Sequence, residues 1–104
     1  MAGKKQGSEE KICTIEISVH SVKRKCPLGI KKGDSWIIDN SFTPPNFCMN
    51  AFGNVFPVLR TFRYGGVHPW DLKGKFGKDI TFVACPDFIN QVIYKLKRVE
   101  DSEE

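Results

Sequence analysis

The clearest helical periodicity in this chain lies between Pro44 and Gly66, in the stretch PPNFCMNAFGNVFPVLRTFRYGG. Its apolar residues recur at steps of three and four, at Phe47, Ala51, Val55, Val58, Leu59 and Phe62. This spacing places them on one face of a helix. We expect Thr43 to cap the helix, Pro44 or Pro45 to lie in its first turn, and Gly65 with Gly66 to end it.

Two residues interrupt this pattern. Gly53 weakens the middle of the helix, and Pro57 lacks the N–H group of a helical hydrogen bond and crowds the preceding turn. We therefore expect either a kinked helix or a split one. In the split form, one helix ends near Gly53 and a second begins near Asn54.

Four short segments around the helix read as strands. The first and last alternate between apolar and polar residues, and the third is a continuous apolar run. The segments are 12–22, 35–38, 80–84 and 91–99. The order β-β-α-β-β predicts the α+β class, with a small, mainly antiparallel sheet and the helix packed on one face. A compact half-open barrel is the alternative.

The inward-facing positions of these elements predict one core. It comprises Ile15, Ile17, Val19, Trp36, Ile38, Ala51, Val55, Leu59, Phe62, Phe82, Val92, Tyr94 and Leu96.

The length of 104 residues indicates one domain. We expect it to span residues 11–99, between a disordered tail at 1–10 and an acidic tail at 100–104, because both ends are too polar to bury a core. The sequence contains neither a long apolar run nor the apolar segment of a signal peptide, so we expect a soluble, cytoplasmic protein without a membrane partner.

The charge of the chain favours anionic partners. Its formal net charge is +4, but residues 11–98 carry 14 Lys or Arg and only 6 Asp or Glu, a net charge of +8. Such a domain should attract nucleic acid, phosphorylated metabolites or carboxylates. Arg60 and Arg63 lie one helical turn apart and could clamp an anionic ligand, since guanidinium groups bind carboxylate and phosphate in a bidentate fork. A solvated helix face is the simpler interpretation of the two arginines.

Three of the four cysteines fall at predicted element boundaries. Cys26 precedes the second strand, Cys48 lies at the start of the helix and Cys85 follows the third strand. A thiolate near a helix N-terminus is stabilised by free N–H groups and the dipole, which makes Cys48 the candidate nucleophile. Cys13 lies mid-strand among apolar residues and reads as a core thiol.

If Cys26, Cys48 and Cys85 converge, His68 could complete a tetrahedral Cys₃His site for zinc, and thiolates also suit iron. Alternatively, Cys48 and Cys85 with His68 could form a catalytic group, or all three thiols could be inert packing residues. No CxxC motif is present to favour the metal site.

Several short motifs occur in a fixed order between Ile12 and Val99. They are Cys-Pro before a Gly-Asp turn, Phe-Cys-x-x-Ala-Phe, Phe-Pro-x-Leu, Arg-Tyr-Gly-Gly, Pro-Trp and Ala-Cys-Pro-Asp. In these motifs the chain resembles a family of small uncharacterised bacterial and archaeal proteins labelled only as repeat proteins of unknown function. Similar members of that family carry cysteines at the positions of Cys26, Cys48 and Cys85, so the resemblance implies that these three thiols are the ones to consider. The resemblance implies no activity, cofactor or fold for this chain.

Three functions of different classes remain open at this point. The first is a cysteine-centred site for a small molecule or a metal, with an anionic ligand; Cys48 and Cys85 would form its floor, and His68, Trp70 and Arg63 its rim. The second is a nucleic-acid-binding module that uses the basic body, with Trp36, Phe47 and Trp70 as stacking surfaces. The third is an accessory subunit that docks on a larger enzyme. Neither enzymatic activity nor oligomeric state follows from the sequence.

Overall fold

The computed structural model describes residues 12–101. The predicted tail at 1–10 and residues 102–104 of the predicted acidic tail lie outside the described residues. Residues 100 and 101 belong to the last strand, so the predicted domain boundary at residue 99 falls two residues too early.

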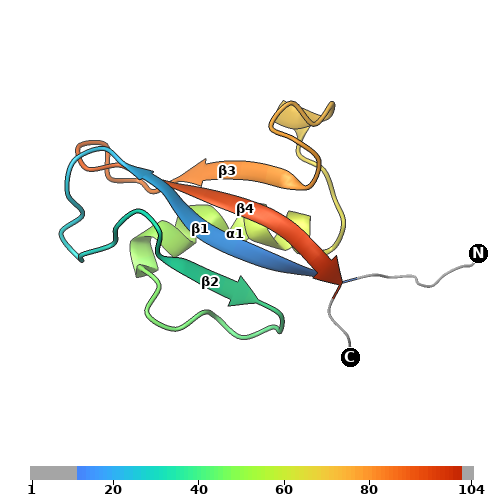
Figure 1. The fold of residues 1–104 in the computed structure, drawn as a ribbon, viewed down its shortest axis with the longest axis horizontal. Coiled ribbons are helices and arrows are strands. Elements are labelled where there is room, and N and C mark those ends of the chain that lie inside the picture. The colour runs from blue at the N-terminus through green and yellow to red at the C-terminus, as the bar shows by residue number, and fades with distance from the viewer. Residues whose placement is uncertain (1–11, 102–104) are drawn as a thin grey trace, which may run out of the picture.

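The four strands form one antiparallel sheet. They are β1 (Cys13–Val22), β2 (Ser35–Ile38), β3 (Ile80–Ala84) and β4 (Val92–Asp101), in the order β2-β1-β4-β3. The helix α1 (Met49–Arg63) lies against one face of this sheet (Figure 1). The predicted α+β class and element order are confirmed. The sheet is open, with β2 and β3 at its edges, and it is not a half-open barrel.

The core lies between α1 and the two central strands. Eleven of the predicted core residues are buried, including Leu59 on α1, which is 4% exposed. Trp36 is only half-buried, because its indole N–H donates to the carbonyl of Pro45 at the margin of the sheet. The helices in residues 12–101 are too short or too polar to cross a lipid bilayer.

Phe82 does not face the core, so its predicted place among the core residues is wrong. Its ring lies 5.0 Å from that of His20 and 5.1 Å from that of Phe76, whereas its neighbour Thr81 is buried in the core. Because every residue of β3 except Thr81 is apolar, period-2 alternation could not indicate which face is inward.

The helix is continuous over 15 residues and includes both Gly53 and Pro57, so the split form is wrong. Both residues lie on the exposed face, where water can bond the Gly53 carbonyl that Pro57 leaves unpaired. The helix begins at Met49, and the predicted cap at Thr43 is therefore also wrong. Cys48 occupies the N-cap position instead.

The end of α1 is the predicted glycine terminator. Gly65 has a φ of 85° and donates to the carbonyl of Phe62, and Gly66 donates to that of Thr61. This pair of hydrogen bonds is the Schellman motif. It turns the chain toward the short 3₁₀-helix η1 (Pro69–Asp71), which follows His68.

Candidate functional site

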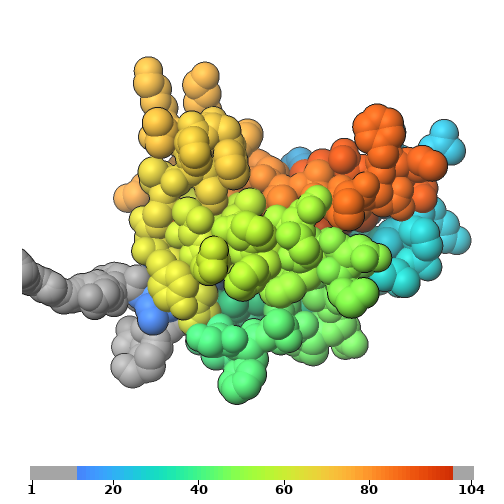
Figure 2. All heavy atoms as spheres, turned by 180° about the vertical axis from the view of Figure 1, so that it is seen from behind, coloured from blue at the N-terminus to red at the C-terminus, as the bar shows by residue number. Residues whose placement is uncertain are grey.

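Cys26, Cys48 and Cys85 line one pocket of about 260 Å³. Their segments meet at the same end of the molecule: the loop after β1, the start of α1 and the loop after β3 (Figures 1 and 2). We call this space the cysteine pocket; Leu28, Asn50, Asp87 and Tyr94 also line it. The structure thus brings together the three thiols that the sequence singles out.

Hydrogen bonds between distant segments hold the walls of the cysteine pocket. The backbone N–H of Lys23 donates to the carbonyl of Gln91 at 2.8 Å, which ties the Cys26 loop to the start of β4. The Asn54 side chain donates to the carbonyl of Ala84 at 3.0 Å, which ties α1 to the end of β3. Cys85 Sγ accepts the N–H of Val92 at 3.2 Å, so this thiol is fixed in place.

Tyr94 lies among the three thiols. It is 1% exposed, and its ring stacks on that of Phe47 with centroids 5.1 Å apart. The pKa of the Tyr94 hydroxyl is raised well above its ordinary value. Burial is the largest cause, and electrostatic repulsion from Cys48, Cys85 and Cys26 adds to it. The hydroxyl therefore keeps its proton and can act as a hydrogen-bond donor at neutral pH.

The start of α1 presents unpaired N–H groups beside Cys48. The first intrahelical hydrogen bond runs from the N–H of Phe52 to the carbonyl of Cys48. The N–H groups of Met49, Asn50 and Ala51 therefore have no partner within the helix. Neither a side-chain cap nor an acidic residue in the first turn offsets the positive end of the helix dipole.

His68 does not join the cysteines, so neither the predicted Cys₃His zinc or iron site nor the catalytic group of Cys48, Cys85 and His68 is assembled. His68 follows the C-terminal end of α1 and Cys48 precedes its start, and a helix of 15 residues is about 22 Å long. Within residues 12–101, no cluster of three or more His, Cys, Asp or Glu side chains is placed to hold a metal ion.

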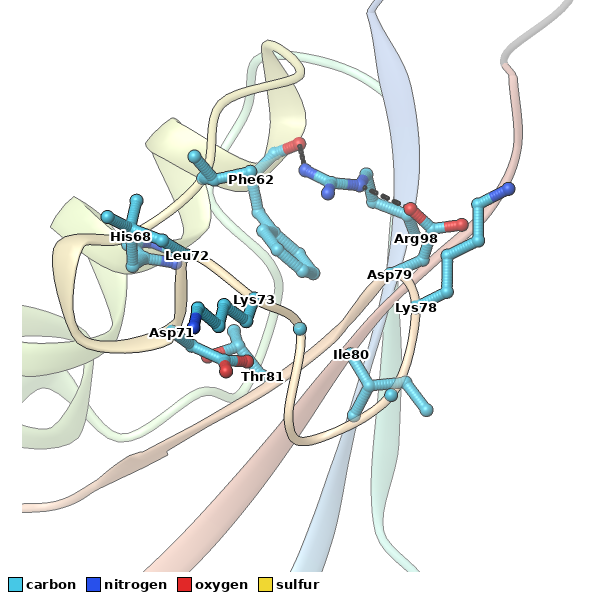
Figure 3. A pocket seen from close by; sticks show the side chains of 13 residues that line it. Phe62, His68, Asp71, Leu72, Lys73, Lys78, Asp79, Ile80, Thr81 and Arg98 are labelled. Carbon is cyan, nitrogen blue, oxygen red and sulfur yellow. Dashed lines mark hydrogen bonds and ion pairs between the residues drawn. The ribbon is translucent and has the colours of Figure 1, made fainter.

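His68 lines a second pocket, of about 380 Å³ (Figure 3). We call it the His68–Thr81 pocket; Phe62, Lys73, Lys78, Asp71, Asp79 and Arg98 also line it. The imidazole of His68 stacks on Phe62 and on Trp70, with ring centroids 5.5 Å and 4.6 Å apart. Trp70 therefore belongs with His68 and does not lie beside the two arginines of α1.

Arg60 and Arg63 line a third pocket, of about 180 Å³, together with aromatic residues that include Phe56 and Tyr64. Arg63 is 8% exposed and donates through Nη1 to the carbonyl of Asn40 at 2.6 Å. Arg60 lies over the ring of Phe56. The simpler reading of a solvated face is thus wrong for Arg63, and the arginine pair lies apart from the thiols.

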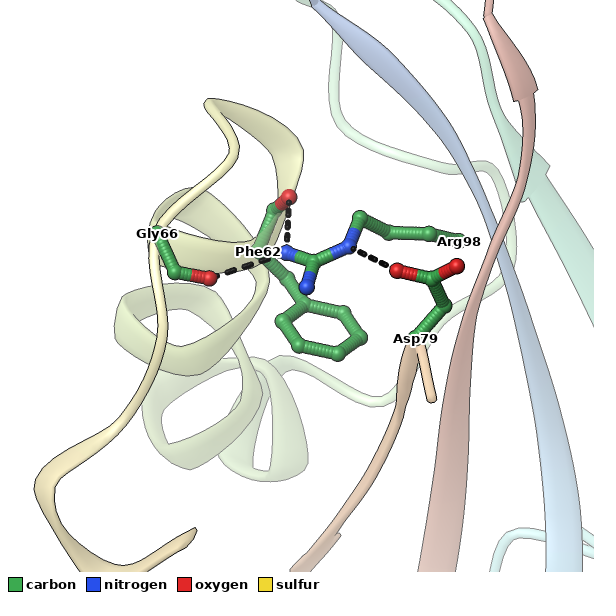
Figure 4. Close-up of polar contacts among 4 residues, drawn as sticks. All are labelled: Phe62, Gly66, Asp79 and Arg98. Atoms are coloured by element: carbon green, nitrogen blue, oxygen red, sulfur yellow. Dashed lines mark hydrogen bonds and ion pairs between the residues drawn. The ribbon is translucent and has the colours of Figure 1, made fainter. Parts of the chain in front are cut away.

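Arg98 is a residue of this region that was not predicted from the sequence. Its Nε bonds Asp79 at 3.0 Å, and its Nη1 donates to the carbonyls of Phe62 and Gly66 (Figure 4). Its guanidinium also lies 3.8 Å from the centroid of the Phe62 ring. The alternation in the last strand is a pattern that could have indicated it. Arg98 continues the inward-facing series of Val92, Tyr94 and Leu96, and a cation at such a position needs buried partners.

No family model, curated protein or solved structure matches this chain. The resemblance to the family of uncharacterised repeat proteins stays an expectation.

Proposed function

We propose that this protein binds a small anionic molecule in the cysteine pocket, with Cys48 as the thiol that contacts the ligand. The observation that carries this proposal is that three free thiols from three separate segments line one pocket together with the buried Tyr94. Thiols that serve only as packing have no need to share one pocket.

The walls indicate how such a ligand is held. Leu28 is 66% exposed and lines the pocket, so an apolar part of the ligand can cover it. The free N–H groups at the start of α1 suit a negatively charged end. The carboxylate of Asp87 also lines the pocket, but it accepts hydrogen bonds from the backbone N–H groups of Ile89 and Asn90. Those bonds hold it in its own loop.

The alternative of a nucleic-acid-binding module has less support. The ring of Trp36 lies 4.6 Å from that of Phe47, and both rings contact Tyr94. Two of the three expected stacking residues are thus engaged with the core. Trp70 is 58% exposed, but it already stacks on His68.

The proposal is tested by alkylating the native protein with iodoacetate and, separately, with its neutral analogue iodoacetamide. Mass spectrometry then gives the rate at each cysteine. We expect Cys48 to react before Cys13, which lies within β1. We also expect the ratio of the iodoacetate rate to the iodoacetamide rate at Cys48 to be higher in the folded protein than in the urea-unfolded one, because the helix N-terminus attracts the carboxylate.

The variant Asn50→Asp provides a matched control. It adds a negative charge to the first turn of α1 at a residue that lines the pocket. It should lower the ratio of the iodoacetate rate to the iodoacetamide rate at Cys48, because the added charge repels only the anionic reagent, whereas any effect on the thiol itself changes both rates alike. Faster labelling of Cys13 than of Cys48, or equal rate ratios in the folded and unfolded protein, would refute the proposed site.

A further inference from the structure

The His68–Thr81 pocket contains two buried polar atoms that have no hydrogen-bond partner in the structure. They are His68 Nε2 and Thr81 Oγ1. Their residues are 5% and 1% exposed, and both line the same pocket. A buried polar group without a partner destabilises the folded protein, and phenylalanine at position 68 or valine at position 81 would fill the same space without that cost. Two such groups in one pocket point to a binding partner that satisfies them.

The contacts of His68 determine what its free nitrogen can bind. Phe62 and Trp70 stack on the imidazole ring, so only its edge is available. One ring nitrogen bonds the backbone of Val58, which leaves Nε2 as the nitrogen without a partner. Burial and, to a smaller extent, the charge of Arg98 lower the pKa of His68 below its ordinary value. Because the ring is then neutral at pH 7, Nε2 is an acceptor and needs an O–H or N–H donor from its partner.

The charges that line this pocket are positive on balance. Arg98 is paired with Asp79, and Lys73 and Lys78 form no ion pair with any other residue in the described range 12–101. The remaining acid is Asp71, whose carboxylate accepts the backbone N–H groups of two residues in its own loop. Apart from the Arg98–Asp79 pair, the lining thus contains two lysines and one carboxylate, and this net positive charge favours an anion; the Lys78 side chain points away from His68 and Thr81, so Lys73 is the cation beside them (Figure 3).

We propose that the His68–Thr81 pocket is a second binding site, which takes a small anion that carries a hydroxyl group, such as a hydroxycarboxylate or the phosphate ester of a polyol. The hydroxyl of the ligand donates to His68 Nε2 and bonds Thr81 Oγ1, and its charged group lies toward Lys73, whose side chain extends between these two residues (Figure 3). A volume of about 380 Å³ lies within the usual range for small-molecule pockets. This site is independent of the cysteine pocket.

The test is a ligand titration of the ¹⁵N-labelled protein, in which binding is monitored through the NMR signals of Thr81 and of the His68 imidazole. The probes are glycerate and glycerol 3-phosphate, and the controls are glycerol, which lacks the charge, and acetate, which lacks the hydroxyl. We expect saturable shifts with glycerate or glycerol 3-phosphate, and weaker effects of both controls. The stronger of the two probes identifies the carboxylate or the phosphate as the preferred group.

Two variants check the roles of the lining residues. Thr81→Val removes the hydroxyl at nearly constant shape, so it should weaken probe binding about tenfold without lowering the melting temperature. Lys73→Met should also weaken binding, whereas Lys32→Met, at an exposed lysine outside the pocket, should not. If neither probe gives saturable shifts up to about 10 mM, the two atoms are satisfied by water alone and the proposed site is wrong. Unchanged binding by Thr81→Val would contradict it equally.

Discussion

Arg98 connects three parts of the chain that are distant in sequence. Its guanidinium bonds the side chain of Asp79 and the carbonyls of Phe62 and Gly66, at the end of α1 and just beyond it. Because the planar fork of arginine can satisfy several acceptors at once, a single residue fixes the end of the helix to β4. The same contacts hold Phe62 in place as a wall of the His68–Thr81 pocket.

Arg98→Lys should lower the free energy of unfolding by about 1–3 kcal/mol, since an ammonium group cannot bond all three acceptors; the Gly66 carbonyl would lose this bond, whereas the Phe62 carbonyl keeps the N–H of Gly65. Urea unfolding followed by circular dichroism measures the change. Arg60→Lys, at an exposed position of α1, is the matched control and should change the stability by no more than about 0.5 kcal/mol. Similar values for both variants would show that the Arg98 contacts contribute little.

At the scale of the elements, α1 tolerates residues that usually interrupt helices. Gly53 and Pro57 both lie on its exposed face, while Val55 and Leu59 are buried against the sheet. Burial of this apolar face stabilises a helix more than its intrinsic propensity does. The element is therefore one helix, although its local sequence is compatible with two.

The two glycines of this region should respond in opposite directions to alanine. Gly53→Ala should raise the free energy of unfolding by roughly 0.5–1 kcal/mol, because a Cβ there meets nothing within 4 Å and alanine is the better helix former. Gly66→Ala should destabilise the protein, since its Cβ would lie 2.8 Å from Thr61 Cγ2. Thermal unfolding of the two variants measures the change in stability. If Gly53→Ala destabilises the protein, the Gly53–Pro57 turn departs from regular helix geometry.

At the scale of the whole molecule, the buried imidazole of His68 couples stability to pH. Its pKa is lower in the folded protein than the ordinary value of 6.5, mainly because of burial. As the pH falls below about 6.5, the unfolded chain binds a proton that the folded protein does not, so the free energy of unfolding decreases. Above that range the residue is neutral in both states and contributes no pH dependence.

Urea unfolding at about pH 7.5 and about pH 5.5 tests this coupling. We expect lower stability at the lower pH, and a smaller difference in the variant His68→Phe. Asp34 and Asp87 have lowered pKa values, but their contributions are lost only as the pH falls toward about 4, outside this window. His20→Gln should retain the pH dependence of the unchanged protein. If His68→Phe retains it in full, another group is responsible.

The sequence by itself determined the element order, the inward face of α1, most of the core and the positions of three thiols at element ends. These features depend on periods of 3.6 and 2 residues and on turn-forming residues, which are local properties of the chain. The candidate site was therefore partly predictable: Cys26, Cys48 and Cys85 stand out because each lies where an element begins or ends.

Only the tertiary structure decided which of these residues meet. The length of α1 separates His68 from Cys48, and the order of the strands places Arg98 beside Asp79. The inward face of β3 was also set by packing, since a uniformly apolar strand carries no alternation. The distances between remote segments depend on sheet order and helix packing, and a sequence pattern that spans a few residues does not encode them.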